Sequence, residues 1–111
     1  MNTFTDIHGR TWTVALPREV RDEIKRCLQF DVLDGRQYQR FATDHNLLVN
    51  VLFIACEQQC RERNLTGQEF VNVLPNDSAQ RLAQVFMRAA FDAMPKRQQR
   101  LLRKRGLEPV G

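Results

Sequence analysis

The sequence has few of the residues that enzymes use as nucleophiles and bases. It contains a single serine, Ser78, whose position is explained as the cap of a following helix. Asp31 and Asp34 lie close together, but a carboxylate pair in a turn is usually solvated, and no third group marks a substrate site. The glycine-rich loops that hold dinucleotides or phosphates are also missing. We therefore expect a protein that is not an enzyme and has no catalytic residues and no cofactor.

Long apolar runs are missing as well. The longest, residues 47–56, is interrupted by Asn50 and is far shorter than the roughly 20 residues that cross a bilayer. The N-terminus does not show a basic stretch followed by an apolar one, as a secretory signal would. These features predict a cytoplasmic protein that has no membrane partner.

Cysteines are few, and their positions do not suggest disulfides. The three cysteines, Cys27, Cys56 and Cys60, cannot all pair within one chain, and each falls among apolar helical positions where a free thiol acts as a small hydrophobe. Cys56 and Cys60 could supply two metal ligands from one helix face. Because neither His8 nor His45 has ligand spacing, we expect no metal site.

Acidic residues are missing from one part of the chain, the stretch between Ala93 and Leu107. The chain has 17 basic and 13 acidic residues, so 11 basic residues remain when the six in this stretch are set aside. The body is therefore slightly acidic, and the basic patch is typical of an interaction tail. Nucleic acid is one possible partner, but the patch contains no aromatic residue for base stacking. The basic patch consists of Lys96, Arg97, Arg100, Arg103, Lys104 and Arg105.

The apolar residues that are present predict a mainly α fold, a compact bundle of about five helices behind an N-terminal β-hairpin. We expect one domain, residues 1–111. Residues 3–15 form the hairpin, residues 17–94 form the helical body, and residues 95–111 form a basic C-terminal helix and tail. No internal repeat or low-complexity linker interrupts this order.

The hairpin is predicted from two short β-prone runs and the turn between them. Asp6 is suited to open a type I turn, and Gly9 is suited to the left-handed position that follows. Two strands alone are marginal in water, so Phe4, Trp12 and Val14 should pack on the helical body. The indole N–H of Trp12 should find its hydrogen-bond partner on that body.

Local signals also predict details of the helices. In the first helix, Asp22 and Arg26 have the spacing of an ion pair. The helix from Asn46 is apolar nearly all round, so it should be the central core helix, and Asn50 within it should be a buried, hydrogen-bonded amide. Residues 66–69 match a capping box that starts a further helix.

Several segments resemble a known family. Their sequence is similar to that of small helical proteins from prophage tail gene modules, the tail assembly chaperones, and the similarity is spread over most of the chain. None of the residues that carry it is catalytic. They are FTDIHGRTWTV at 4–14, IKR at 24–26, DVLD at 31–34, LVNVLF at 48–53, and Phe70.

The resemblance implies a non-enzymatic helper that covers the long helical tape-measure protein while tail subunits polymerise around it. Such a helper would offer an apolar groove to a partner helix, and Phe86, Met87 and Phe91 are candidates for it, although apolar helical positions are more often core. One alternative is a structural subunit of a phage-like tail or capsid that forms homo-oligomers through its hairpin and basic tail. Another is a nucleic-acid-binding protein that acts through its basic C-terminal segment.

Overall fold

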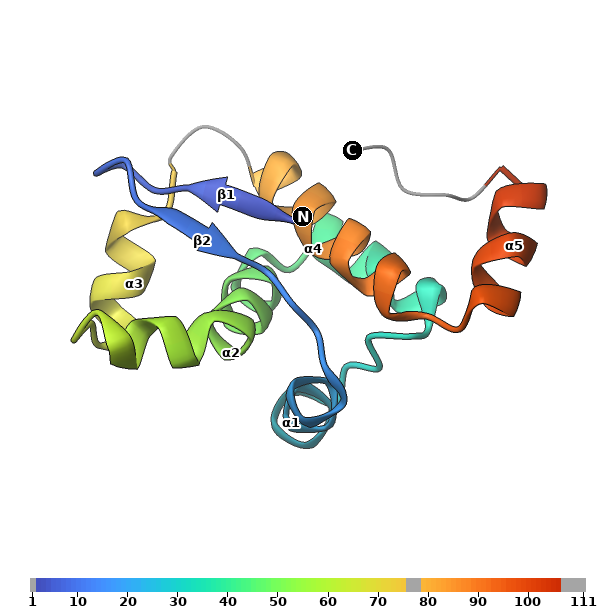
Figure 1. Cartoon of the computed structure of the whole chain (residues 1–111), viewed down its shortest axis with the longest axis horizontal. Helices are drawn as coiled ribbons and strands as arrows, with labels where there is room; N and C mark the ends of the chain where they lie inside the picture. Colours follow the sequence, from blue (N-terminus) through green and yellow to red (C-terminus); the bar gives the residue numbers. More distant parts are fainter. Residues whose placement is uncertain (1, 76–78, 107–111) are drawn as a thin grey trace.

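The computed structural model describes residues 2–75 and 79–106. Within these ranges it confirms a mainly α fold, with five α-helices and one 3₁₀-helix behind an antiparallel hairpin (Figure 1). The Cα radius of gyration is 13.6 Å, close to the value of about 13 Å expected for a compact chain of this length. The elements are β1 (Thr3–Thr5), β2 (Thr11–Thr13), α1 (Arg18–Leu28), η1 (Gly35–Ala42, the 3₁₀-helix), α2 (His45–Glu62), α3 (Gly67–Val73), α4 (Ala79–Ala93) and α5 (Lys96–Lys104).

The hairpin packs on the helices as predicted. Phe4 pairs with Trp12 across β1 and β2, and both side chains are buried. The turn closes through a hydrogen bond from the Gly9 N–H to the Asp6 carbonyl at 3.0 Å, and Gly9 has a φ of 82°. The Trp12 ring packs nearly perpendicular to Phe70 of α3, with ring centroids 5.0 Å apart. The contact between Trp12 and Phe70 thus joins the hairpin to the helical body.

The indole N–H of Trp12 finds its partner inside the hairpin, so the prediction of a partner on the helical body was wrong. It donates to the Asp6 carboxylate at 2.8 Å. The same carboxylate accepts hydrogen bonds from the backbone N–H groups of His8 and Arg10 and from the Arg10 guanidinium. Asp6 was predicted only as a turn residue, but its side chain folds inward under the turn, where it meets the indole.

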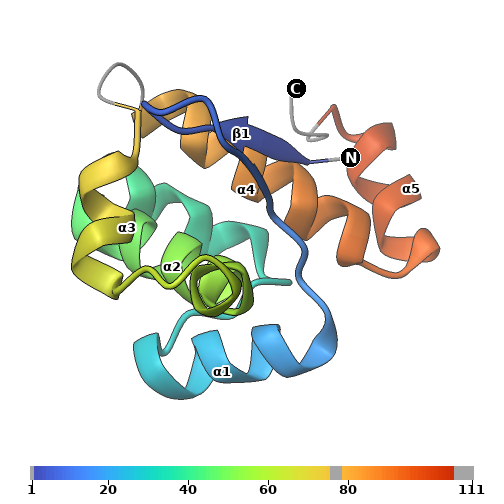
Figure 2. The same cartoon turned by 60° about the vertical axis from the view of Figure 1, so that its left-hand side comes forward.

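Helix α2 is the central core helix, as predicted. It contacts α1, η1, α3 and α4, and in Figure 2 it lies between α1 on one side and α4 with the hairpin on the other. Asn50 is exposed, so the prediction of a buried amide was wrong. Asn46 and Asn50 are four residues apart and lie on the same exposed face, which the surrounding helices leave open. The buried side chains of α2 are Leu47, Leu48, Val51, Leu52, Cys56 and Cys60.

Helix α1 is amphipathic and buries Ile24, but two of its details differ from the sequence predictions. Cys27 is exposed, because the buried face of α1 is narrower than its apolar sequence pattern suggested. Arg26 pairs with Glu23, three residues before it, instead of with Asp22. Both partners have a spacing that places them beside Arg26 on the helix surface, so spacing alone does not choose between them.

Local start and stop signals are confirmed at two helix ends. Thr66 and Glu69 form the capping box of α3, in which each side chain accepts a hydrogen bond from the backbone N–H of the other residue. Pro95 separates α4 from α5. The predicted cap Ser78 lies outside the described residues. None of the helices in the described ranges is long and apolar enough to span a membrane.

Candidate partner-binding surface

Helix α5 stands at one end of the molecule and has no buried residue (Figure 1). Two glutamine side chains connect it to the body. The Gln98 amide donates to the Leu33 carbonyl at 3.1 Å, and the Gln99 amide donates to the Met94 carbonyl at 2.9 Å. The face of α5 opposite to these two residues is therefore directed away from the body.

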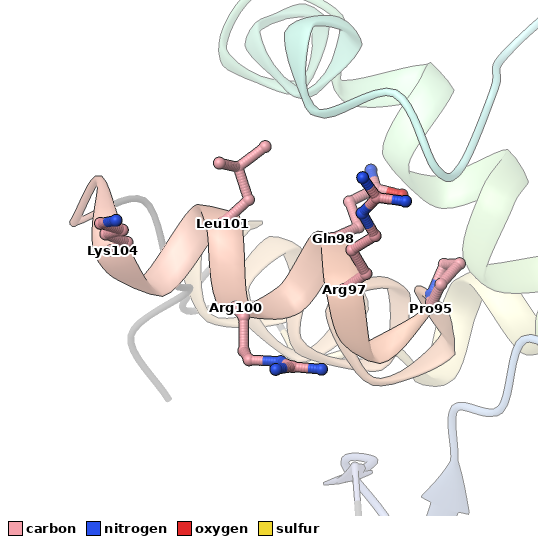
Figure 3. A pocket seen from close by; sticks show the side chains of 6 residues that line it. All are labelled: Pro95, Arg97, Gln98, Arg100, Leu101 and Lys104. Atoms are coloured by element: carbon pink, nitrogen blue, oxygen red, sulfur yellow. The ribbon is translucent and has the colours of Figure 1, made fainter.

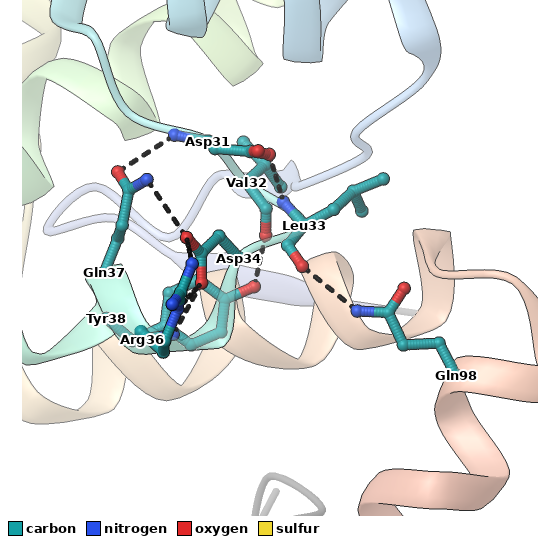
Figure 4. A network of polar contacts seen from close by, with 8 residues as sticks. All are labelled: Asp31, Val32, Leu33, Asp34, Arg36, Gln37, Tyr38 and Gln98. Atoms are coloured by element: carbon teal, nitrogen blue, oxygen red, sulfur yellow. Dashed lines mark hydrogen bonds and ion pairs between the residues drawn. The ribbon is translucent and has the colours of Figure 1, made fainter.

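The Leu33 carbonyl that accepts the Gln98 hydrogen bond lies in the loop of residues 31–34, and polar groups of this loop and of η1 hold it in place (Figure 4). The Asp31 carboxylate accepts a hydrogen bond from the Leu33 N–H, and the Asp34 carboxylate caps η1 by accepting from the Arg36 N–H. The Tyr38 hydroxyl donates to the Val32 carbonyl. The Arg36 guanidinium lowers the pKa of Asp34 to about 2. The two carboxylates therefore fix the loop that positions α5.

A pocket of about 420 Å³ lies where η1, α4 and α5 meet, and we call it the η1–α4 pocket. Its apolar walls come from a tyrosine of η1, a methionine and a phenylalanine of α4, the methionine that follows α4, and a leucine of α5. Because Leu102 is half-buried in this pocket, it is the apolar residue that seats α5 on the body. The apolar lining residues are Tyr38, Met87, Phe91, Met94 and Leu102.

The three predicted partner-binding residues occupy different environments. Phe86 is fully buried, packs edge-on against Phe41 with centroids 5.5 Å apart, and so presents no surface to a partner. Phe91 is also covered, because the guanidinium groups of Arg88 and Arg103 lie 5.4 and 5.3 Å from its ring centroid. It is one of the residues that line the η1–α4 pocket. Met87 is half-buried and lines the wall of this pocket.

The predicted basic patch covers α5 and its C-terminal end, and its six side chains are exposed. Three of them, Arg97, Arg100 and Lys104, line a shallow hollow of about 820 Å³ together with Leu101 (Figure 3). Leu101 is 49% exposed. In Figure 3, Leu101 and Arg100 point to opposite edges of this face. We call the face formed by Arg97, Arg100, Leu101 and Lys104 the α5 outer face.

The cysteines do not form part of this surface. Cys56 and Cys60 are buried in α2, and burial raises the pKa of the Cys56 thiol to about 12. Among residues 2–75 and 79–106, no group of three or more His, Cys, Asp or Glu side chains is arranged to hold a metal ion. The two core thiols therefore act as packing groups.

The η1–α4 pocket and the α5 outer face together are the candidate partner-binding surface. Sequence patterns indicated Phe86, Met87, Phe91 and the basic residues as candidates, and all of these except the buried Phe86 line the pocket or lie on α5 and its C-terminal end. The roles of Tyr38, Gln98 and Leu101 were not predicted. Leu101 and Leu102 are adjacent in sequence, and only the way in which α5 packs on the body makes Leu101 exposed and Leu102 half-buried. Comparison of the chain with protein-family models, curated proteins and solved structures found no match.

Proposed function

We propose that this protein is a non-enzymatic binding protein that helps another protein to assemble, similar to a phage tail assembly chaperone acting on a tape-measure protein. The η1–α4 pocket is the main support, because it is an apolar depression where three elements meet. Pockets of this kind accept apolar side chains from a partner helix. The resemblance to tail assembly chaperones supports a long helical partner.

The lining of the η1–α4 pocket suits a partner with a varied sequence. Met87 and Met94 are unbranched and adapt to different apolar side chains, while the Tyr38 ring provides a rigid wall. Each partner side chain that becomes fully buried contributes about 1.5–3 kcal/mol before the costs of association. A site that holds one or two such side chains binds weakly, as a helper that must later leave its partner requires.

Co-expression with a long helical protein encoded by a neighbouring gene tests this proposal. We expect the partner to be soluble and to co-purify with the wild-type chain, and we expect Met87→Glu to abolish both effects. Val71→Glu is the matched control, because Val71 is an exposed apolar residue on α3. A complex that survives Met87→Glu, or the absence of any complex with the wild-type chain, would contradict the proposal. Recovery of the chain in finished particles would instead identify a structural subunit.

A further inference from the structure

The α5 outer face combines an apolar side chain with cations that form no ion pair with a described acid. Arg97 and Lys104 are seven residues apart, so they lie one above the other on the helix with about 10.5 Å between them along its axis. Leu101 lies beside this pair and Arg100 lies on its other side (Figure 3). None of the ion pairs between described residues involves Arg97, Arg100 or Lys104. This face therefore presents positive charge beside one exposed leucine.

Within residues 2–75 and 79–106, a second copy of the chain offers few unpaired acids to these cations. Most acidic side chains of the described body already have partners within the chain. Asp44 and Glu69 cap α2 and α3. The acids that pair with arginines are Asp6, Asp22, Glu23, Asp34, Glu57 and Asp92. The charge on the α5 outer face is therefore better matched by a different molecule that carries negative charge.

Two features favour an acidic protein helix over nucleic acid. Leu101 is half-exposed at the edge of the face, beside the basic residues, and phosphate groups would gain nothing from an apolar side chain there. Residues 95–106 also contain no aromatic ring on which a base could stack. An amphipathic helix satisfies both parts of the face, because its apolar stripe can cover Leu101 while its acids meet the cations.

We propose that the α5 outer face binds an acidic amphipathic helix of a partner protein, with one apolar partner residue on Leu101 and acids seven residues apart next to Arg97 and Lys104. This inference deepens the proposed function and rests on it, because it specifies the chemistry of the partner helix. The partner's charge provides orientation and fast association, and its apolar residue provides the contact that distinguishes it from other polyanions.

Binding of labelled model peptides to the full-length protein tests this inference. The probes are 21-residue amphipathic helices with leucine on the apolar stripe and glutamate on both flanks, and matched peptides with glutamine or lysine instead of glutamate. By fluorescence anisotropy near physiological ionic strength, we expect the glutamate peptide to bind about tenfold more tightly than the glutamine peptide. The lysine peptide should not bind. Equal binding of the glutamate and glutamine peptides would overturn the proposal.

Charge reversal locates the site. The triple variant Arg97→Glu, Arg100→Glu and Lys104→Glu should no longer bind the glutamate peptide and should bind the lysine peptide instead. Binding of the lysine peptide requires a folded α5, so a variant that fails to fold cannot imitate it. Leu101→Ala should weaken binding of the glutamate peptide several-fold. Unchanged binding by the triple variant would overturn the proposal.

The matched control changes net charge by the same amount at other places. It carries Arg18→Glu, Lys25→Glu and Arg81→Glu, which are exposed on α1 and α4. We expect it to bind the glutamate peptide within about twofold of the wild-type affinity, apart from a general loss of long-range attraction. A loss as large as that of the α5 triple variant would mean that total charge, and not the α5 outer face, recruits the peptide.

Three further outcomes separate this inference from nucleic-acid binding and from the proposed function. If duplex DNA binds more tightly than the glutamate peptide at the same salt concentration and Leu101→Ala leaves DNA binding unchanged, the inference is overturned. If the neighbouring-gene protein co-purifies equally well with the wild-type chain and the α5 triple variant, the inference fails while the proposed function stands. If the glutamate peptide binds but that protein does not, the proposed function fails and the α5 assignment keeps its support.

Discussion

Asp6 shows how one buried carboxylate can organise a hairpin. Its side chain has no exposed surface, and burial alone would raise its pKa. The hydrogen bonds from the Trp12 indole, from the backbone N–H groups of Arg10 and His8, and from the Arg10 side chain outweigh that effect and lower the pKa of Asp6 to about 2. The turn and the aromatic core contact thus depend on the same ionised group.

Replacement of Asp6 by asparagine should destabilise the fold, because the amide has no charge and one acceptor atom fewer. We expect the free energy of unfolding, measured in urea by circular dichroism, to fall by about 1–3 kcal/mol. Asp22→Asn is the control, since this exposed acid lies 3.9 Å from Arg18 and should change stability by less than about 0.5 kcal/mol. Equal losses in the two variants would contradict this role for Asp6.

The lowered pKa also predicts how stability depends on pH. In the unfolded chain Asp6 titrates near 3.8, whereas in the folded protein it titrates near 2. Its contribution is therefore present above pH 3.8 and is lost as the pH falls toward 2, and it amounts to about 2 kcal/mol. Urea unfolding of wild type and Asp6→Asn between pH 5 and pH 2 should show the two stabilities converging. A constant difference would contradict the pKa assignment.

At the scale of elements, the best-predicted features are those that depend on neighbours in sequence. The capping box of α3 and the boundary between the helical body and the C-terminal helix at residue 95 follow from residues within one turn of each other. The partner of Trp12, the exposure of Asn50 and the bond from Gln98 to Leu33 depend on how distant segments pack. For this reason the chain order of the helices was predictable, whereas the η1–α4 pocket was not.

Loss of the α3 cap is a prediction at this scale. Thr66→Ala removes the hydroxyl that accepts from the Glu69 N–H at 3.1 Å, so the free energy of unfolding should fall by about 1 kcal/mol. Thr66→Ser keeps the hydroxyl and should stay close to wild type. Thermal unfolding followed by circular dichroism would measure both variants. An alanine variant as stable as the serine variant would show that the capping box contributes little.

At the scale of the whole molecule, the core and the charged surface are separated in space. The core gathers around α2 and includes Cys56 and Cys60, while Cys27 lies outside it on α1. The exposed cations Arg97, Arg100 and Lys104, which take part in none of the ion pairs between described residues, lie on α5, and this helix has no buried residue. The sequence indicated this division through its slightly acidic body and basic patch, although it placed Cys27 among the core residues.

Thiol reactivity tests whether Cys56 and Cys60 are buried in this core. A chromogenic disulfide reagent should react with one thiol, that of Cys27, in the native protein, and with all three after denaturation. Cys27→Ser should remove the fast reaction of the native protein and leave only a slow reaction of Cys56 and Cys60. This reaction is slow because the two thiols of α2 become accessible only when the fold opens. Native reaction of the Cys27→Ser variant at the rate of a free thiol would contradict the described packing of α2.

The position of α5 at one end of the molecule, secured by Leu102 and two glutamines, has a consequence for proteolysis. Trypsin cuts after lysine and arginine and needs a locally unfolded segment, so α5 should be cut first and the remaining helices should persist as a resistant fragment. The residues proposed to attract a partner are also the cleavage sites. A protein bound there would therefore protect α5, and its arrival could be timed from the slowing of the first cut.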